Sequence, residues 1–153
     1  MKHIPIITGI DHIYISVSDM TKSENFYDMV MLALGFRKNC FEIDNERHVQ
    51  FYCRHFGFVI RPSHNSVTHK SSNPGLHHLC LRVESQADVF TCAESLKALG
   101  VNITEPVNYP EYAPDYYAFT FNDPDGIRLE VTNYRQERRE RHDSWETAEK
   151  MNS

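Results

Sequence analysis

Two stretches of alternating polar and apolar residues begin two similar segments of the chain. In GIDHIYISV, residues 9–17, the alternation runs through His12, and in GLHHLCLRV, residues 75–83, it runs through His78. A period of two is typical of a strand that packs one face on a core. The sequence therefore predicts two related strands, each with a histidine at the same place on its polar face.

A helical pattern follows each of these strands. The two patterns cover residues 19–36 and 85–101. Each has a capping residue at its start and a glycine at its end, Asp19 and Gly35 in the first and Ser85 and Gly100 in the second. The interval from the histidine to the glycine is nearly equal in the two copies, which indicates a duplicated unit.

Three strand-like runs follow each helix. They cover residues 36–43, 48–55 and 57–62 in the first half, and residues 101–107, 116–123 and 126–134 in the second. This order predicts an α+β fold of two tandem βαβββ modules within one domain of 153 residues. The modules span about 9–62 and 75–133, with a polar connector at 63–74 and a charged tail at 134–153 that we expect to form a solvated helix.

Composition narrows the range of partners. The net charge is −5 with both signs mixed along the chain, which argues against a nucleic-acid-binding face. No apolar run approaches the roughly 20 residues of a membrane span, and the first residues lack the pattern of a secretion signal. The four cysteines form no C-x-x-C pair, so we expect reduced thiols. We therefore expect a cytoplasmic protein that binds a small molecule.

The two histidine-bearing modules, together with DPDGIRLEV at residues 123–131, resemble the vicinal oxygen chelate superfamily. This superfamily includes glyoxalase I, extradiol dioxygenases, fosfomycin-resistance proteins and bleomycin-binding proteins. The resemblance extends from about Gly9 to Asn133. It implies two modules that form a partial barrel around a divalent metal ion, with His12, His78 and Glu130 as ligands.

The residue chemistry agrees with this ligand set. In GIRLEV, residues 126–131, alternation places Glu130 on the polar face of its strand, as it does for the two histidines. Two imidazoles and one carboxylate suit Fe²⁺, Mn²⁺, Zn²⁺ or Ni²⁺ and leave positions open for a substrate. Glu130 is also a candidate proton acceptor.

Two tyrosines are candidates for the same site. Tyr14 lies beside His12 on the polar face by alternation, and its phenol is a candidate catalytic group. Tyr117 belongs to the aromatic stretch at residues 108–119 and is a candidate to close over the substrate, with aromatic packing within the loop as the alternative.

Arginines on the polar faces point to an anionic, oxygen-rich substrate, because guanidinium groups bind carboxylates and phosphates in a bidentate manner. The candidates are Arg61, Arg82 and Arg128. The alternative is that individual arginines pair with Glu130 or lie at the rim of the site. We interpret His77 as structural, and we expect four further histidines in loops or at the surface: His48, His55, His64 and His69.

Glyoxalase I enzymes usually have a fourth ligand, a glutamate on the last strand of the first module. Matching GFVIRP to GIRLEV by their glycines places Arg61 opposite Glu130, so the chain resembles the three-ligand branch. Fosfomycin-resistance proteins share the three ligands, but Tyr14 stands where they commonly have threonine.

These observations favour a divalent-metal enzyme of glyoxalase or dioxygenase type that chelates neighbouring oxygen atoms of its substrate. Oxygen insertion, isomerisation, lyase chemistry and epoxide opening stay open. The alternatives are a metal-free binding protein of the bleomycin-resistance type and, from the charged tail, a subunit-interaction protein. We expect a homodimer, with the site either within one chain or shared between two.

Overall fold

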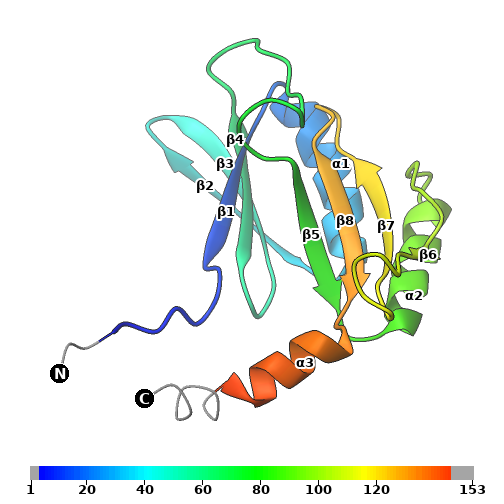
Figure 1. Ribbon diagram of the computed structural model, residues 1–153. Helices are drawn as coiled ribbons and strands as arrows, with labels where there is room; N and C mark the ends of the chain where they lie inside the picture. Colours follow the sequence, from blue (N-terminus) through cyan, green and yellow to red (C-terminus); the bar gives the residue numbers. More distant parts are fainter. Residues whose placement is uncertain (1–3, 146–153) are drawn as a thin grey trace. The chain divides into compact units, whose positions relative to one another are not determined.

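The computed structural model describes residues 4–145. The chain divides into two compact units between Thr68 and His69, within the stretch where the sequence predicts the connector. Each unit contains one four-stranded sheet and one helix that follows its first strand (Figure 1).

The first unit has the predicted order of elements. They are β1 (His12–Val17), α1 (Met20–Ala33), β2 (Arg37–Ile43), β3 (Glu46–Tyr52) and β4 (Gly57–Pro62). The strands lie in the order β1-β4-β3-β2, with β1 parallel to β4 and the other pairs antiparallel.

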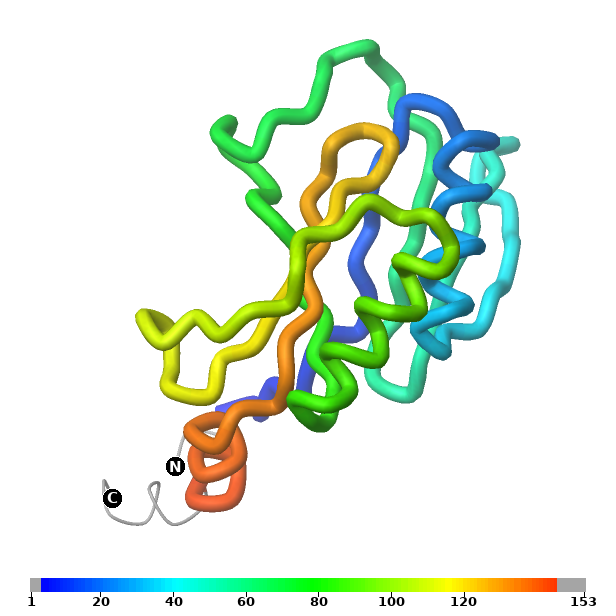
Figure 2. The backbone as a smooth tube through the Cα atoms, turned by 90° about the vertical axis from the view of Figure 1, so that its right-hand side faces the viewer, coloured from blue at the N-terminus to red at the C-terminus, as the bar shows by residue number. Residues whose placement is uncertain are grey.

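The second unit repeats this arrangement. Its elements are β5 (His78–Val83), α2 (Gln86–Ala98), β6 (Val107–Asn108), β7 (Tyr117–Asn122) and β8 (Arg128–Asn133). The strand order is β5-β8-β7-β6, with β5 parallel to β8. Figure 2 shows α2 running along this sheet, where it contacts β8, β7 and β5. The predicted α+β fold of two βαβββ modules is confirmed, and neither sheet closes on itself.

The helix ends are formed by the predicted residues. The Asp19 side chain accepts a hydrogen bond from the backbone of α1, and the Ser85 side chain does the same for α2. Gly35 and Gly100 follow the two helices with φ of 84° and 79°, a left-handed conformation that other residues adopt only with strain. The two helices therefore end for the same reason in both units.

Strand alternation buries the predicted faces. On β1, Ile15 and Val17 are 5% and 1% exposed, whereas Tyr14 between them is 45% exposed. Tyr27 of α1 is fully buried, and its ring lies 5.0 Å from that of Phe58 on β4. Burial of large apolar side chains supplies most of the stabilisation of such a core, at about 1.5–3 kcal/mol for each.

The second core is built in the same way. Helix α2 buries Val89, Ala93 and Leu96, and β8 buries Leu129 and Val131. Since α2 contacts β8, the helix covers the face of the sheet on which these strand residues lie.

One predicted strand is much shorter in the structure. The run at residues 101–107 gives only β6, together with an isolated bridge between Ile103 and Phe121. Three residues separate Ile103 from Val107, whereas two separate their partners Phe121 and Ala118. The extra residue breaks the ladder, and Pro106, which has no N–H to donate, lies in this break.

The charged tail forms α3 (Gln136–Asp143), which buries none of its residues. The predicted solvated helix is thus confirmed for these residues, and residues 146–153 of the tail lie outside the described part of the chain. No helix within residues 4–145 is long and apolar enough to cross a membrane.

An ion cluster joins α1 to the sheet of the first unit. Glu24 on α1 accepts hydrogen bonds from Lys38 of β2 at 2.7 Å and from Arg47 of β3 at 2.8 Å. The Arg47 hydrogen bond and the Lys38 ammonium lower the pKa of Glu24 from 4.5 to about 2, against the opposing effect of burial.

A carboxylate with a lowered pKa stabilises the folded state above its unfolded-state pKa, and this stabilisation is lost as the pH falls towards the folded-state pKa. We predict that Glu24→Gln lowers the free energy of unfolding near neutral pH, and that the loss shrinks as the pH falls from 4.5 towards 2. Urea unfolding at several pH values measures this. Glu42→Gln, at an exposed position of β2, is the control. A loss that is independent of pH would contradict the prediction.

Candidate metal centre

Parallel pairing of β5 with β8 brings His78 and Glu130 together. In the ladder Cys80 lies opposite Glu130, and His78 lies opposite Arg128. Residues opposite one another project from the same face of a sheet. The Nε2 atom of His78 lies 3.3 Å from Oε2 of Glu130, whose side chain is 12% exposed. The structure therefore places an imidazole and a shielded carboxylate in contact.

His12 begins β1 in the first unit and is oriented by the residue before it. Its Nδ1 lies 2.7 Å from the carboxylate of Asp11, to which it donates in the neutral tautomer with Nδ1–H. The lone pair of Nε2 is then available to a metal ion, an arrangement common for histidine ligands. As His12 belongs to the other compact unit, its joining His78 and Glu130 as a ligand stays a prediction.

The second histidine has an equivalent neighbour. Nδ1 of His78 lies 2.7 Å from Nδ1 of His77, which occupies the place in the repeat that Asp11 occupies in the first unit. When Nδ1–H of His78 donates to His77, the Nε2 of His78 carries a lone pair on the side of Glu130. His77 is therefore a partner of His78, beyond the structural role expected from its position on the other face.

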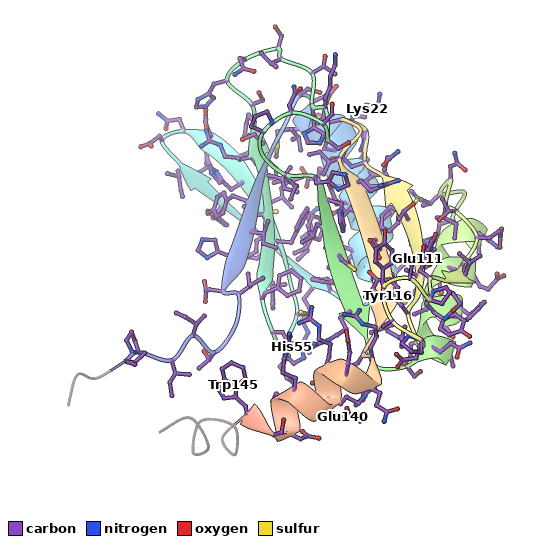
Figure 3. All side chains as sticks on the ribbon, in the orientation of Figure 1. Lys22, His55, Glu111, Tyr116, Glu140 and Trp145 are labelled. Atoms are coloured by element: carbon purple, nitrogen blue, oxygen red, sulfur yellow. The ribbon has the colours of Figure 1, made fainter. Side chains whose placement is uncertain are left out.

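Tyr116 is a site residue that the sequence analysis missed. Its hydroxyl donates to Oε1 of Glu130 at 2.6 Å. Figure 3 labels Tyr116 among the side chains of the second unit. Burial and this hydrogen bond raise the pKa of Tyr116 well above its ordinary value, so the phenol keeps its proton. Strand alternation could have identified it. Tyr116 is four residues before Thr120 and so projects from the same face, and Thr120 lies opposite Glu130 in the ladder of β7 and β8.

Tyr117, the residue selected from the sequence, lies on the wrong face. Tyr117 is two residues before Phe119 and so projects from the same face, and Phe119 lies opposite Val131 on the core side of the sheet. The ring of Tyr117 is 6.3 Å from that of Phe90 on α2. The tyrosine on the face of Glu130 is thus its immediate neighbour Tyr116, because one step along a strand reverses the face.

Cys80 lies beside the pair on the same face. Surrounding protein atoms dehydrate its sulfur, although the residue as a whole is exposed, and the charge of Glu130 adds to this effect. Together they raise the pKa of the Cys80 thiol to about 12. Cys80 therefore stays protonated at neutral pH.

The three candidate arginines differ in their surroundings. Arg61 forms an ion pair with Glu46 and contacts His64 at 2.8 Å. Arg82 stacks on the ring of Tyr134, with its guanidinium carbon 4.0 Å from the ring centroid. Arg128 is exposed and forms no ion pair with any described residue. Within their own units, two of the three arginines thus already have partners.

The match of Arg61 to Glu130 is wrong by two residues. The ladder pairs His12 with Gly57 and Tyr14 with Val59, whereas it pairs His78 with Arg128 and Cys80 with Glu130. The structural counterpart of Glu130 is therefore Val59. The two glycines are not equivalent, because Gly57 lies within the ladder of β4 and Gly126 lies in the turn before β8, with φ of 80°. Val59 cannot bind a metal ion, so the first unit still lacks the fourth ligand.

Tyr14 lies between two histidines on the sheet of the first unit. Its ring is 5.4 Å from that of His12 and 5.9 Å from that of His48. His48 was expected in a loop or at the surface, but it lies on β3, is 3% exposed and stacks on Phe41. Of the other three histidines expected in loops or at the surface, His55 and His64 are exposed and His69 is half-buried.

In the described part of the chain, no group of three or more His, Cys, Asp or Glu side chains is assembled in a form that holds a metal ion. His78 and Glu130 nevertheless supply two ligands of suitable type, each with its remaining polar atom engaged by a neighbour. This donor chemistry fits a first-row divalent ion, provided that a third ligand such as His12 completes the set.

Comparison with known proteins shows which proteins this chain resembles. Residues 59–131 match the model of the Glyoxalase/Bleomycin resistance protein/Dioxygenase superfamily. A glyoxylase/bleomycin resistance protein/dioxygenase domain from Frankia sp. EAN1pec has a similar crystal structure, with a TM-score of 0.69 and 23% sequence identity over 85% of this chain and 100% of that chain.

Two named enzymes have similar structures. The fosfomycin resistance protein FosX from Listeria monocytogenes, solved with Mn(II) and sulfate, gives a TM-score of 0.60 at 20% identity, over 88% of this chain and 98% of that chain. Lactoylglutathione lyase from Agrobacterium tumefaciens gives 0.59 at 20% identity, over 84% and 94% of the two chains. The match at residues 59–131 and the shared fold confirm the resemblance of this chain to the vicinal oxygen chelate superfamily of glyoxalases, bleomycin resistance proteins and dioxygenases.

Proposed function

We propose that this protein is a divalent-metal-dependent enzyme that binds neighbouring oxygen atoms of a small-molecule substrate. The observation that carries the proposal is the contact of His78 with Glu130, at 3.3 Å on adjacent parallel strands. His12 is the proposed third ligand, from the same chain or from a second copy in the predicted homodimer. The predicted cytoplasmic location is part of the same proposal.

Two neutral imidazoles and one carboxylate would leave a bound divalent ion with one net positive charge and with coordination positions free for the substrate. A bound divalent ion would supply Lewis acidity to the substrate oxygens. Manganese is the first ion to test among Fe²⁺, Mn²⁺, Zn²⁺ and Ni²⁺, because the similar FosX structure contains Mn(II).

The chain's own residues have distinct roles in this proposal. Tyr116 holds Oε1 of Glu130 at 2.6 Å and thereby fixes the direction of Oε2 towards His78. Tyr14, whose ring lies 5.4 Å from that of His12, can donate a hydrogen bond to a substrate oxygen. Glu130 can also accept a proton from the substrate.

The reaction belongs to the range of the superfamily, which includes the neighbours FosX and lactoylglutathione lyase. The three ligands are compatible with isomerisation, lyase chemistry, oxygen insertion and epoxide opening, since one Lewis acid supports all of these reactions. The alternative function is metal-free binding of a drug or metabolite. It would leave His78 and Glu130 without a ligand role.

Metal uptake by the purified protein separates these two functions. We predict about one Mn²⁺ bound per chain by elemental analysis after dialysis, and binding weaker by about 100-fold or more in Glu130→Gln, because the substitution removes an anionic ligand. Glu105→Gln, which removes a carboxylate paired with Lys97, is the matched control and should bind as the wild type does. Equal binding by Glu130→Gln would contradict the assignment of Glu130 as a ligand, and no uptake of any first-row divalent ion would support metal-free binding instead.

Removal of the Tyr116 hydroxyl tests its positioning role. We predict that Tyr116→Phe weakens Mn²⁺ binding by about 10- to 100-fold, because the Glu130 carboxylate loses the hydrogen bond that holds it in position. Isothermal titration calorimetry measures the Kd, and thermal unfolding shows that the fold is intact. Tyr109→Phe is the control, since Tyr109 packs on the ring of Tyr116 and its hydroxyl makes no hydrogen bond to Glu130. An unchanged Kd in Tyr116→Phe would limit Tyr116 to packing.

A further inference from the structure

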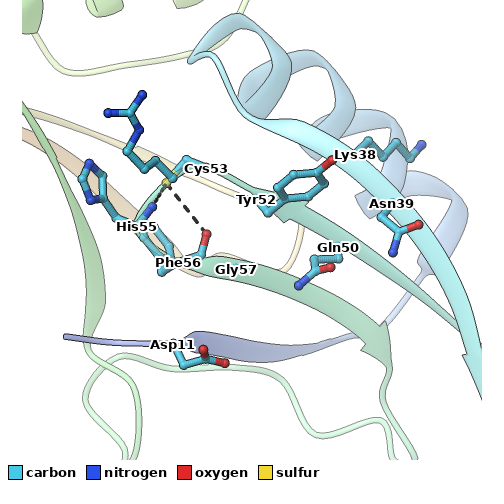
Figure 4. Close-up of a pocket in the computed structure, with 10 residues that line it drawn as sticks. Asp11, Lys38, Asn39, Gln50, Tyr52, Cys53, His55, Phe56 and Gly57 are labelled. Atoms are coloured by element: carbon cyan, nitrogen blue, oxygen red, sulfur yellow. Dashed lines mark hydrogen bonds between the residues drawn. The ribbon is translucent and has the colours of Figure 1, made fainter. Parts of the chain in front are cut away.

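The sheet of the first unit has a cavity on the face that carries His12. Its volume is about 490 Å³, within the usual range for small-molecule sites, and all of its lining residues come from residues 11–57. Figure 4 shows Asp11, Gln50, Tyr52 and Gly57 around it.

The β-ladders fix which side chains share this face. Asn39 lies opposite Gln50, Gln50 opposite Val59, and Val59 opposite Tyr14. The amides of Asn39 and Gln50 therefore project from the same side of the sheet as Tyr14 and His12. Tyr52 joins them, because it lies opposite Gly57, which in turn lies opposite His12.

These polar groups have unused hydrogen-bonding capacity. Across residues 4–145, the side-chain amides of Asn39 and Gln50 have no hydrogen-bond partner. An amide group that lines a cavity has two N–H donors to offer a ligand. The cavity is thus equipped to bind acceptor oxygens.

The charges around the cavity are unequal. The ammonium of Lys38 is neutralised by Glu24 and Asp28, each at 2.7 Å. The carboxylate of Asp11 accepts a hydrogen bond from the neutral imidazole of His12 and keeps its negative charge. Arg54 also lines the cavity, and it forms no ion pair within the described chain. Arg54 is therefore the cation of the lining that has no acidic partner in the described chain, and its guanidinium is the group that favours an anion.

Glycine at position 57 keeps the cavity open. A Cβ atom there would lie 2.6 Å from Nε2 of Gln50, closer than real contacts allow. Any side chain at this position would displace the Gln50 amide. The lack of a side chain at position 57 therefore leaves space beside His12 for the Gln50 amide and for a ligand.

We propose that this cavity binds a carboxylate-bearing part of the substrate through the amides of Asn39 and Gln50 and the guanidinium of Arg54. The inference rests on the proposed function only in assigning this carboxylate to the substrate of the metal site. The sequence predicts that Arg61 and Arg82 bind an anion, but Arg61 is paired with Glu46 and Arg82 stacks on Tyr134. In this proposal Arg54, which forms no ion pair within residues 4–145, binds the anion instead.

The test uses the full-length, ¹⁵N-labelled protein freed of metal, with glycolate as the probe and glycolamide as its neutral match. We expect glycolate to shift the side-chain amide signals of Asn39 and Gln50 saturably in NMR spectra. Glycolamide should bind about tenfold more weakly, since hydrogen bonds to a charged acceptor are stronger than hydrogen bonds to a neutral one. Equal binding of the two probes, or no saturable shift, would overturn the proposal.

Two variants locate the probe. Gln50→Glu keeps the shape of the side chain but presents a carboxylate, so the affinity for glycolate should fall about tenfold or more. Gly57→Ala should reduce it by displacing the Gln50 amide. Gln86→Glu makes the same change of charge at an exposed position of α2 and is the control. Affinity that is unchanged in Gln50→Glu, or reduced equally in Gln86→Glu, would refute the assignment.

The absence of metal from the sample keeps the two proposals separate. Glycolate binding without any metal uptake by the protein would contradict the proposed enzyme and support the cavity. Metal uptake without glycolate binding would contradict the cavity and leave the enzyme supported.

Discussion

Parallel pairing of the first and last strands in each unit is the constraint on which the candidate site depends. A helix separates the two strands in the sequence of each unit, and in each the strand that begins the module ends up beside the strand that closes it. In the second unit this pairing fixes the register that brings Nε2 of His78 to 3.3 Å from Glu130. A shift by one residue would turn Glu130 into the core, where an unpaired carboxylate is strongly unfavourable. The register is therefore held by core burial of Leu129 and Val131 as much as by the site itself.

The two units place different residues on the same framework. Each begins with a histidine whose Nδ1 contacts the preceding residue, Asp11 in one unit and His77 in the other. At the equivalent position on the last strand, the second unit has Glu130 and the first has Val59. With an apolar residue there and a glycine at position 57, the first unit forms a cavity beside its histidine. The repeated framework thus supplies two similar faces, one with the proposed metal ligands and the other with the proposed site for a substrate group.

Much of the fold could be predicted from local patterns. The caps at Asp19 and Ser85 and the left-handed glycines after the helices follow from short-range backbone chemistry, and the alternation in β1 follows from burial of one face. The sequence-based predictions were wrong where the pairing of strands far apart in the sequence determines the position of a residue. The counterpart of Glu130 depends on the register between strands far apart in sequence. The burial of His48 depends on its stacking against Phe41 across a hairpin. Tyr116 was missed because the aromatic cluster offered several tyrosines, and only the parity relative to Glu130 distinguishes them.

The central claim is that two histidines, one from each unit, coordinate the same metal ion together with Glu130. Pulsed electron paramagnetic resonance of the Mn²⁺-loaded protein counts the imidazole nitrogens coupled to the ion. The account predicts two coupled imidazoles in the wild type and one in His12→Ala. A single coupled imidazole in the wild type, or a spectrum that His12→Ala leaves unchanged, would contradict it.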